Sequence, residues 1–146
     1  DVIHGYRTIF PVPLGEAASW DLVSMERTAA IAAAESKASG VHWTFAPMVD
    51  IARDPRWGRV IEGAGEDTFL GSKIAFARVR GFQGTDYSAN NRILATAKHW
   101  VGYGAAEAGR DYNTTNLSER SLREIYFPPF KSAIDAGVDS FMTSFN

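Results

Sequence analysis

The chain has 146 residues, enough for one domain with a hydrophobic core, and 45% of them are hydrophobic while 22% are charged. A net charge of −2 without a run of like charges argues against a nucleic-acid or membrane-surface partner, and no window is apolar enough to span a bilayer. The absence of cysteine excludes a disulfide framework and a thiolate metal site.

The first predicted elements are a helix and a strand. Residues 19–39 favour a helix because their middle is rich in alanine, with Ser19 as the expected N-cap and Gly40 just past the end. Residues 41–51, VHWTFAPMVDI, are aromatic and β-branched, which predicts a strand.

A second helix and a second strand follow a loop that contains proline and glycine. Asp67 is the expected N-cap of a helix over residues 68–80, which Gly81 would end. Residues 92–100, RILATAKHW, form the next expected strand, and a glycine-rich loop comes directly after it.

The last predicted elements are an interrupted helix and a strand. Ser118 is a good N-cap, but Pro128 and Pro129 should kink or break the helix that follows it. Residues 138–145, VDSFMTSF, predict a final strand.

The order of these elements predicts the fold class. Helices alternate with strands, and the strands are apolar runs more than alternating ones, which favours an α/β fold with a parallel sheet covered by helices. Polar side chains follow each predicted strand, and in a βα barrel the C-terminal strand ends carry the chemistry. Both ends of the chain look cut, since it opens on Asp1 without a preamble and stops at an apolar run.

Four motifs in this order resemble a known family. They are DVIHGYRTIFPVPLG, FAPMVDIARDPRWGRVIEGAGED, KHWVGYGAAEAGRDYN and SERSLREIYFPPFKSAIDAG. Together they are similar to the N-terminal barrel domain of glycoside hydrolase family 3, in the branch of the bacterial periplasmic β-glucosidases. The resemblance implies that residues 1–146 are part of a single barrel domain truncated at both ends, namely roughly the first half of a TIM (β/α)8-type barrel.

The resemblance also implies a reaction. Family members hydrolyse β-glycosides with retention, using an aspartate nucleophile and a glutamate acid/base, and the branch implies terminal non-reducing β-D-glucosyl residues as the group cleaved here. Neither motif occurs here, so no catalytic residue is expected in this chain, and the segment alone should be inactive. The implied partners are a β-linked glucoside or oligosaccharide, the remainder of the barrel and a C-terminal sandwich domain. No metal or cofactor is implied, and the location would be periplasmic or secreted.

Six residues are candidates for substrate binding by resemblance. Asp1 would accept hydrogen bonds from the sugar hydroxyls, and the guanidinium of Arg59 would hold neighbouring hydroxyls or orient the missing carboxylate. The full set is Asp1, Arg7, Arg59, Lys98, His99 and Arg110.

Lys98 and His99 are expected to point together into the pocket and bind adjacent hydroxyls. A regular strand sends neighbouring side chains to opposite faces, so the pair must lie at a strand end or bulge, or otherwise depart from normal alternation. A positive charge on Lys98 would also help to keep the nucleophile ionised.

Other residues around these motifs have expected structural roles. Arg53 and Asp54 would hold their loop shut, and Asp111 could pair with Arg110. Glu107 is expected on the loop surface. Trp43 and Trp57 are expected to be structural and not platforms for a sugar ring. Met142 and Phe145 are expected either in the pocket wall or in the core.

Two alternatives remain open from the residues alone. One is a barrel lyase that forms a Schiff base on Lys98, with nearby cations lowering the pKa of its amine. The other is a carbohydrate-binding protein without activity, because sugar ligands are present and both catalytic carboxylates are absent. A half barrel also exposes open sheet edges and an apolar face, so the isolated segment is expected to aggregate or unfold in part.

Overall fold

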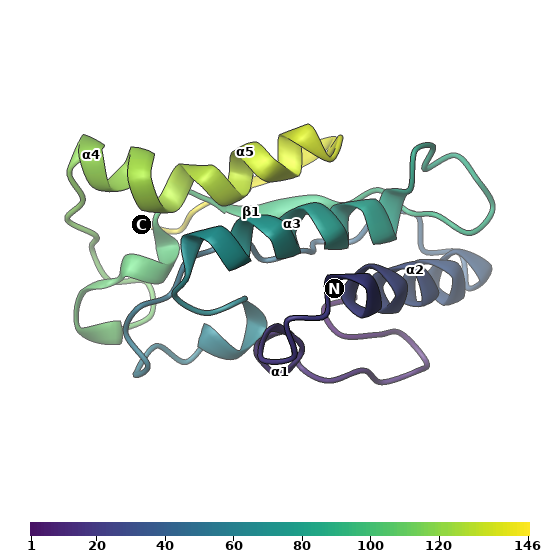
Figure 1. The fold of residues 1–146 in the computed structure, drawn as a ribbon, viewed down its shortest axis with the longest axis horizontal. Coiled ribbons are helices and arrows are strands. Elements are labelled where there is room, and N and C mark those ends of the chain that lie inside the picture. The colour runs from purple at the N-terminus through teal and green to yellow at the C-terminus, as the bar shows by residue number, and fades with distance from the viewer.

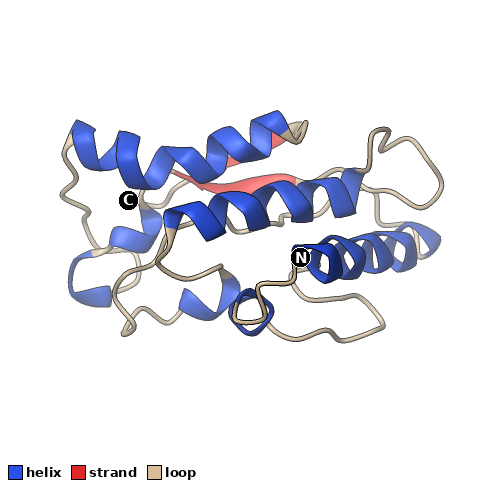
Figure 2. Cartoon of the chain, viewed as in Figure 1, coloured by secondary structure: helices blue, strands red, loops and turns tan.

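A computed structural model describes residues 1–146 as parallel strand segments with helices packed on one side of them (Figures 1 and 2). Strand β1 (Thr96–Trp100) pairs in parallel with β2 (Ser140–Thr143), with Thr96 opposite Ser140. The α-helices are α1 (Pro13–Ala17), α2 (Leu22–Ala38), α3 (Thr68–Gln83), α4 (Glu119–Ser121) and α5 (Phe127–Asp135). None of them is long and apolar enough to cross a lipid bilayer.

The predicted strand over residues 41–51 is only partly formed. This segment runs parallel to β1 along its other edge, with bridges between Trp43 and Leu94 and between Met48 and Lys98. The ladder is interrupted between these bridges at Pro47, which has no N–H to donate. The segment still takes the place of a strand next to β1, as the predicted fold requires.

The helices begin and end at different residues from those expected. The N-cap of α2 is Asp21, whose Oδ1 accepts a hydrogen bond from the backbone N of Ser24 at 3.0 Å. The prediction of Ser19 was wrong, because its hydroxyl donates to the carbonyl of Glu16 at 2.7 Å, just after the end of α1. The predicted N-cap Asp67 of α3 is confirmed by its hydrogen bond from Leu70 N at 2.6 Å.

Gly81 lies inside α3 and does not end it. The helix continues to Gln83 and is followed by Gly84, which has a positive φ of 63°. A Cβ at position 81 would lie 2.4 Å from the carbonyl oxygen of Glu26 and 2.6 Å from the Cβ of Ala29, both on α2. The glycine therefore serves the close approach of α2 and α3, a tertiary contact that the local helix-end signal cannot reveal.

The prolines of the last helical segment do not end it. Ser118 is the N-cap, as predicted, and accepts a hydrogen bond from Ser121 N at 3.1 Å. A π-helical turn over Leu122–Tyr126 then joins α4 to α5, and Pro128 and Pro129 fall in the first turn of α5. Backbone N–H groups in the first turn of a helix have no partner inside the helix, so prolines there remove no hydrogen bond. In place of the expected break, the chain therefore forms the widened π-helical turn just before α5.

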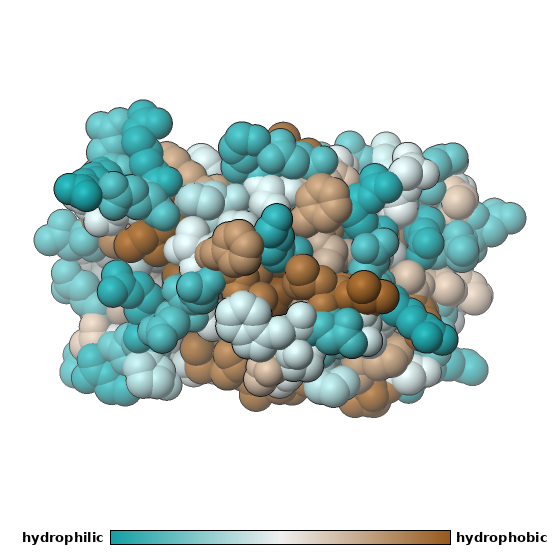
Figure 3. Space-filling view, in the orientation of Figure 1, coloured by the Kyte–Doolittle hydropathy of each residue, from teal (hydrophilic) through white to brown (hydrophobic).

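The core lies between the helices and the strand segments. α2 packs against α3, α3 packs against α5, and α5 contacts β1. Three alanines of α2 (Ala29, Ala32 and Ala33), together with Phe82 and Ile93, belong to one buried cluster, and Val79 and Phe130 belong to a second cluster beside β1. Figure 3 shows further apolar side chains across the middle of the face that is turned to the viewer in Figure 1.

Candidate functional site

Three hydrogen-bonded pairs of ionisable side chains lie near the C-terminal ends of the strand segments and in the loop that follows one of them. The first pair joins Lys98 at the end of β1 to Asp1, with Nζ 2.9 Å from Oδ2. The lysine side chain is only 2% exposed, whereas that of Asp1 is 33% exposed. Burial and the positive charge of Arg59 lower the pKa of Lys98, while the carboxylates of Glu62 and Asp50 act in the opposite direction.

The position of Asp1 depends on its two neighbours in sequence. The backbone N of Val2 donates to the hydroxyl of Thr44 at 3.1 Å. The guanidinium of Arg78 on α3 donates to the carbonyl of Ile3, and its Nη1 lies 2.6 Å from Oε2 of Glu16 in a buried ion pair. The strand segment and α3 therefore hold the backbone on which Asp1 lies.

The second pair joins His99 to Asp50, which follows the segment that bridges to β1. Oδ2 of Asp50 lies 2.7 Å from Nδ1 of His99 and accepts a hydrogen bond from the backbone N of the same histidine at 3.1 Å. Both side chains are 1% exposed. Burial raises the pKa of Asp50, and the hydrogen bonds and charge of His99 act against this rise.

Lys98 and His99 adjoin an irregularity in β1. Lys98 pairs with Met142 and Trp100 with Thr143, so His99 is an extra residue in the ladder. The expectation that the lysine and histidine lie at a strand end or bulge is confirmed. Both are buried, while Trp100, the next residue, is exposed and stacks on Phe127.

The third pair joins Arg59 to Glu62 through two hydrogen bonds. Nε and Nη2 of Arg59 donate to the two carboxylate oxygens of Glu62 at 2.8 and 2.9 Å. The hydrogen bond from Arg59 lowers the pKa of Glu62, and the charges of Lys98 and His99 add to this effect. The guanidinium also lies over the ring of Tyr103, 5.4 Å from its centroid. We call these six residues, Asp1, Asp50, Arg59, Glu62, Lys98 and His99, the polar cluster.

The glycine-rich loop after β1 forms one wall beside the polar cluster. A Cβ on Gly104 would lie 2.3 Å from the carbonyl oxygen of Ile51, so only glycine allows the loop to pack this closely. Tyr103 is fully buried, and its hydroxyl donates to Asp111, which also accepts from Nε1 of Trp57 at 2.9 Å. Burial and this hydrogen bond raise the pKa of Tyr103 to about 12.

Aromatic rings close around His99. The ring of Tyr103 lies 4.9 Å and that of Phe145 5.3 Å from the imidazole, centroid to centroid, and Tyr112 contacts Phe145 at 5.4 Å. Phe145 is 51% exposed, so it lies at the open side of the site. The imidazole is therefore held between rings on one side and Asp50 on the other.

The two other predicted binding arginines, Arg7 and Arg110, make no hydrogen bond or ion pair with the polar cluster. Arg7 is exposed, and its backbone N donates to Glu35 of α2 at 2.9 Å. Arg110 is also exposed, and its backbone N donates to the carbonyl of Glu107 at 3.2 Å. Their roles in binding remain predictions.

The expected pairing of Asp111 with Arg110 was wrong. Asp111 accepts hydrogen bonds from Nε1 of Trp57 and from the hydroxyl of Tyr103, and it makes no pair with Arg110. Asp54 bonds Arg56 within the same loop, at 2.6 Å between Oδ2 and Nη2, and also accepts from the backbone N of Arg56.

Two other expectations about single residues are borne out. Glu107 lies on the exposed loop surface, as predicted, and Trp57 is buried, as its expected structural role requires. Trp43 is 54% exposed, with its indole N–H donating to the hydroxyl of Thr96 at 2.8 Å, and its structural role stays a prediction.

Three residues of the site, Asp50, Glu62 and Tyr103, have no predicted role from the sequence. A signal for Asp50 was present, since an acidic residue in an apolar, strand-like run implies burial with a partner. For Glu62 and Tyr103 no comparable signal exists, because their partners depend on how two loops pack. No group of three or more histidine, aspartate or glutamate side chains is placed to hold a metal ion.

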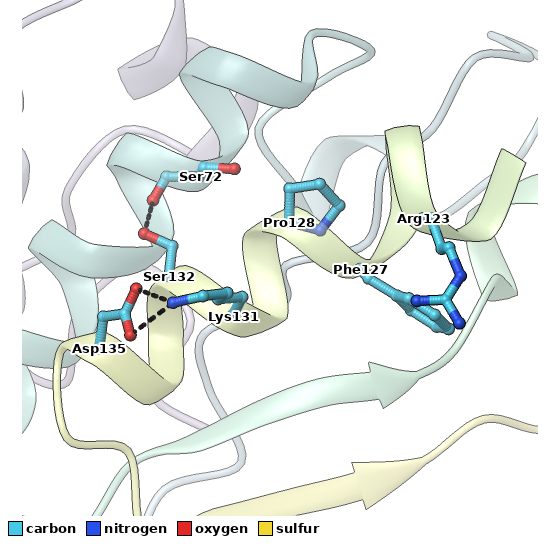
Figure 4. Close-up of a pocket in the computed structure, with 7 residues that line it drawn as sticks. All are labelled: Ser72, Arg123, Phe127, Pro128, Lys131, Ser132 and Asp135. Carbon is cyan, nitrogen blue, oxygen red and sulfur yellow. Dashed lines mark hydrogen bonds and ion pairs between the residues drawn. The ribbon is translucent and has the colours of Figure 1, made fainter. Parts of the chain in front are cut away.

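A separate pocket lies on the helical side, between α3 and α5 (Figure 4). Its charged groups are already occupied, since Lys131 bonds Asp135 at 2.7 and 2.9 Å and Arg123 bonds Glu119 at 2.8 Å. The hydroxyl of Ser132 donates to the carbonyl of Ser72 at 2.7 Å. The pocket therefore offers little free hydrogen-bonding capacity, and the polar cluster is the better candidate site.

The whole chain, residues 1–146, matches the model of the glycosyl hydrolase family 3 N-terminal domain. The chain belongs to glycoside hydrolase family 3. It is 42% identical over 146 residues to a periplasmic β-glucosidase of Salmonella typhimurium, covering 100% of this chain and 19% of that protein. It is 39% identical to a β-xylosidase of Formosa agariphila, covering 95% of this chain and 20% of that protein.

Solved structures agree with this family membership. A β-glucosidase from Listeria innocua in complex with glucose is 49% identical, with a TM-score of 0.97, and is matched over 100% of this chain and 21% of that chain. Structures of the same enzyme with isofagomine and, as a mutant, with laminaribiose match with TM-scores of 0.96 and 0.97. This family-3 chain thus has the expected α/β fold of a partial barrel, and it spans about a fifth of the length of these relatives.

Proposed function

We propose that this chain is the glycone-binding part of a β-glucosidase-type glycoside hydrolase that cleaves terminal β-D-glucosyl residues with retention. The observation that carries the proposal is the Lys98–Asp1 pair, whose atoms lie 2.9 Å apart beside His99 in a family-3 chain. In such a pair an ammonium donates hydrogen bonds and a carboxylate accepts them, which is the combination that neighbouring sugar hydroxyls require.

Arg59 would act at the edge of the same site. Its guanidinium is already oriented by two hydrogen bonds to Glu62 and by the ring of Tyr103 beneath it. A guanidinium fixed in this way presents its remaining N–H groups in one direction, toward either a hydroxyl or a carboxylate.

The proposal extends to the parts of a family-3 enzyme that these residues do not include. The nucleophile aspartate and the acid/base glutamate would come from outside residues 1–146, and those residues would be roughly the first half of a larger barrel followed by a sandwich domain. A β-linked glucoside or oligosaccharide is the proposed substrate, supported by the complexes of the Listeria innocua enzyme. A periplasmic or secreted location is proposed from the relative in Salmonella typhimurium.

The test is an assay of the complete chain that carries this segment, with p-nitrophenyl β-D-glucoside as substrate. We expect hydrolysis with retention, and a loss of kcat/KM of about a hundredfold or more in Lys98→Ala, because a charged hydrogen-bonding group is removed from the glycone. Lys131→Ala is the matched control, since this lysine is exposed on α5 and bonds only Asp135.

Other outcomes would replace the proposal. A complete chain that binds glucose but does not hydrolyse the substrate would indicate a binding protein without catalysis. A lysine adduct trapped by borohydride with a carbonyl substrate would support the Schiff-base alternative at Lys98. Equal losses in the two lysine variants would show that the buried lysine has no special role in the site.

A further inference from the structure

Asp50 is a buried carboxylate for which the proposed function gives no direct role. Its side chain is 1% exposed, and its two hydrogen bonds both go to His99, one to the backbone N and one to Nδ1 of the ring. A charge removed from water in this way is costly unless it is paired and hydrogen-bonded. The carboxylate is therefore committed to one residue.

We propose that Asp50 is the positioning residue of His99, holding the imidazole with a proton on Nδ1 so that Nε2 is the ring nitrogen left for a hydroxyl of the glycone. The proposal rests on the proposed function for its sugar-binding part. It adds a residue that does not touch the sugar but determines which atom of His99 does.

The hydrogen bonds fix which ring nitrogen carries the proton. An ionised carboxylate only accepts hydrogen bonds, so a ring nitrogen 2.7 Å from Oδ2 must be the donor. Burial raises the pKa of Asp50, but the backbone N of His99 donates to the same Oδ2 at 3.1 Å, and this hydrogen bond and the positive charge of Arg59 favour the ionised carboxylate. The other nitrogen of the ring then remains free, as in other sites where a carboxylate sets the tautomer of a functional histidine.

The surroundings of His99 also restrict the orientation of its ring. Tyr103 and Phe145 lie 4.9 and 5.3 Å from the imidazole, and the backbone N of His99 is held by the same Oδ2 that contacts Nδ1. With the main chain and the ring tied to one oxygen, the direction of Nε2 follows from the position of Asp50.

The first experiment is neutron crystallography of the complete chain that carries this segment, without ligand. We expect a deuterium on Nδ1 of His99, directed at Asp50. An imidazole with deuterium only on Nε2 overturns the proposal. This readout needs no activity, so it separates a failure of the Asp50 proposal from a failure of the proposed glycosidase function.

The second experiment measures kcat/KM in the same chain for Asp50→Asn, for His99→Ala and for the double variant. We expect Asp50→Asn to lower kcat/KM by about tenfold, as for other partners that orient a functional histidine, and to have no further effect when His99 is alanine. An equal loss in both backgrounds overturns the proposal, because Asp50 would then not act through His99.

Asp54→Asn is the matched control for this experiment. It removes a carboxylate four residues along the chain that bonds Arg56, and we expect kcat/KM to be unchanged. A loss in Asp54→Asn as large as in Asp50→Asn would mean that any carboxylate of this segment matters equally, which also overturns the proposal. If Asp50→Asn does not fold, the proton position in the unmodified chain decides.

Discussion

Replacement of Gly81 by alanine tests the close approach of α2 and α3. The new Cβ would lie 2.4 Å from the carbonyl oxygen of Glu26 and 2.6 Å from the Cβ of Ala29, where ordinary contacts are about 3.5–4.0 Å. Because one of these atoms is backbone, the two helices must separate by roughly 1 Å, and overpacking of this kind costs about 1–3 kcal/mol. Alanine is about 1 kcal/mol better than glycine inside a helix, which offsets part of this cost.

Gly71→Ala is the matched control, because it has the same gain in helix propensity in the same helix. There the new Cβ would be 2.9 Å from Cδ1 of Ile51, the end of a flexible side chain, and 3.9 Å from Pro129. We expect Gly71→Ala to be close to neutral, and Gly81→Ala to be less stable than it by about 1–2 kcal/mol.

The measurement is amide hydrogen exchange of the peptides that cover α2 and α3 in the complete chain that carries this segment. Exchange reports the local opening free energy, so it remains valid when other domains unfold separately. Equal protection in Gly81→Ala and Gly71→Ala would refute the reasoning, since the only difference between the two sites is what the new methyl group meets.

Three further predictions concern charge and exposure. Arg78→Met should lower the local opening free energy of α3 by about 3–5 kcal/mol, because it leaves Glu16 buried without its partner, and Glu16→Gln in the same chain should recover part of the loss. The measurement is again amide hydrogen exchange in the complete chain that carries this segment. Glu62→Gln should lower stability at pH 7, and the difference from the unmodified chain should vanish as the pH falls through the lowered pKa of Glu62; a difference that persists at lower pH would contradict a role for the carboxylate charge. The isolated 146-residue chain should bind a hydrophobic dye and aggregate, and a cooperative thermal transition of the monomer would contradict this.

Much of the architecture follows from local patterns in the sequence. The caps at Asp67 and Ser118 and the position of Lys98 and His99 at an irregularity of the strand are confirmed, and the predicted order of helices and strands holds except that residues 41–51 form only isolated bridges. Each of these depends on a few neighbouring residues, such as a side-chain oxygen three residues before a free backbone N–H. Local signals of this kind predict the structure correctly where no tertiary contact opposes them.

The errors arise where a distant contact overrules a local preference. Gly81 has the residue type of a helix end, but the backbone of α2 requires a glycine there. The partners in two of the three pairs of the polar cluster are similarly far apart in sequence, with a separation of 97 positions for Asp1 and Lys98 and of 49 for Asp50 and His99. A single sequence shows the charged residues but not their pairing, because the pairing depends on which strand segments lie side by side.

The three hydrogen-bonded pairs of the polar cluster differ in burial, and this difference suits different roles. Asp50 and His99 are both 1% exposed, so a ligand cannot replace their mutual hydrogen bond, and Asp50 can only orient the histidine. The carboxylate of Asp1 is 33% exposed beside a lysine that is almost fully buried, so a hydroxyl can reach the acid while the amine stays fixed. Because each charged side chain of the polar cluster is already hydrogen-bonded to a partner, a neutral sugar can bind by adding hydrogen bonds without leaving any buried charge uncompensated.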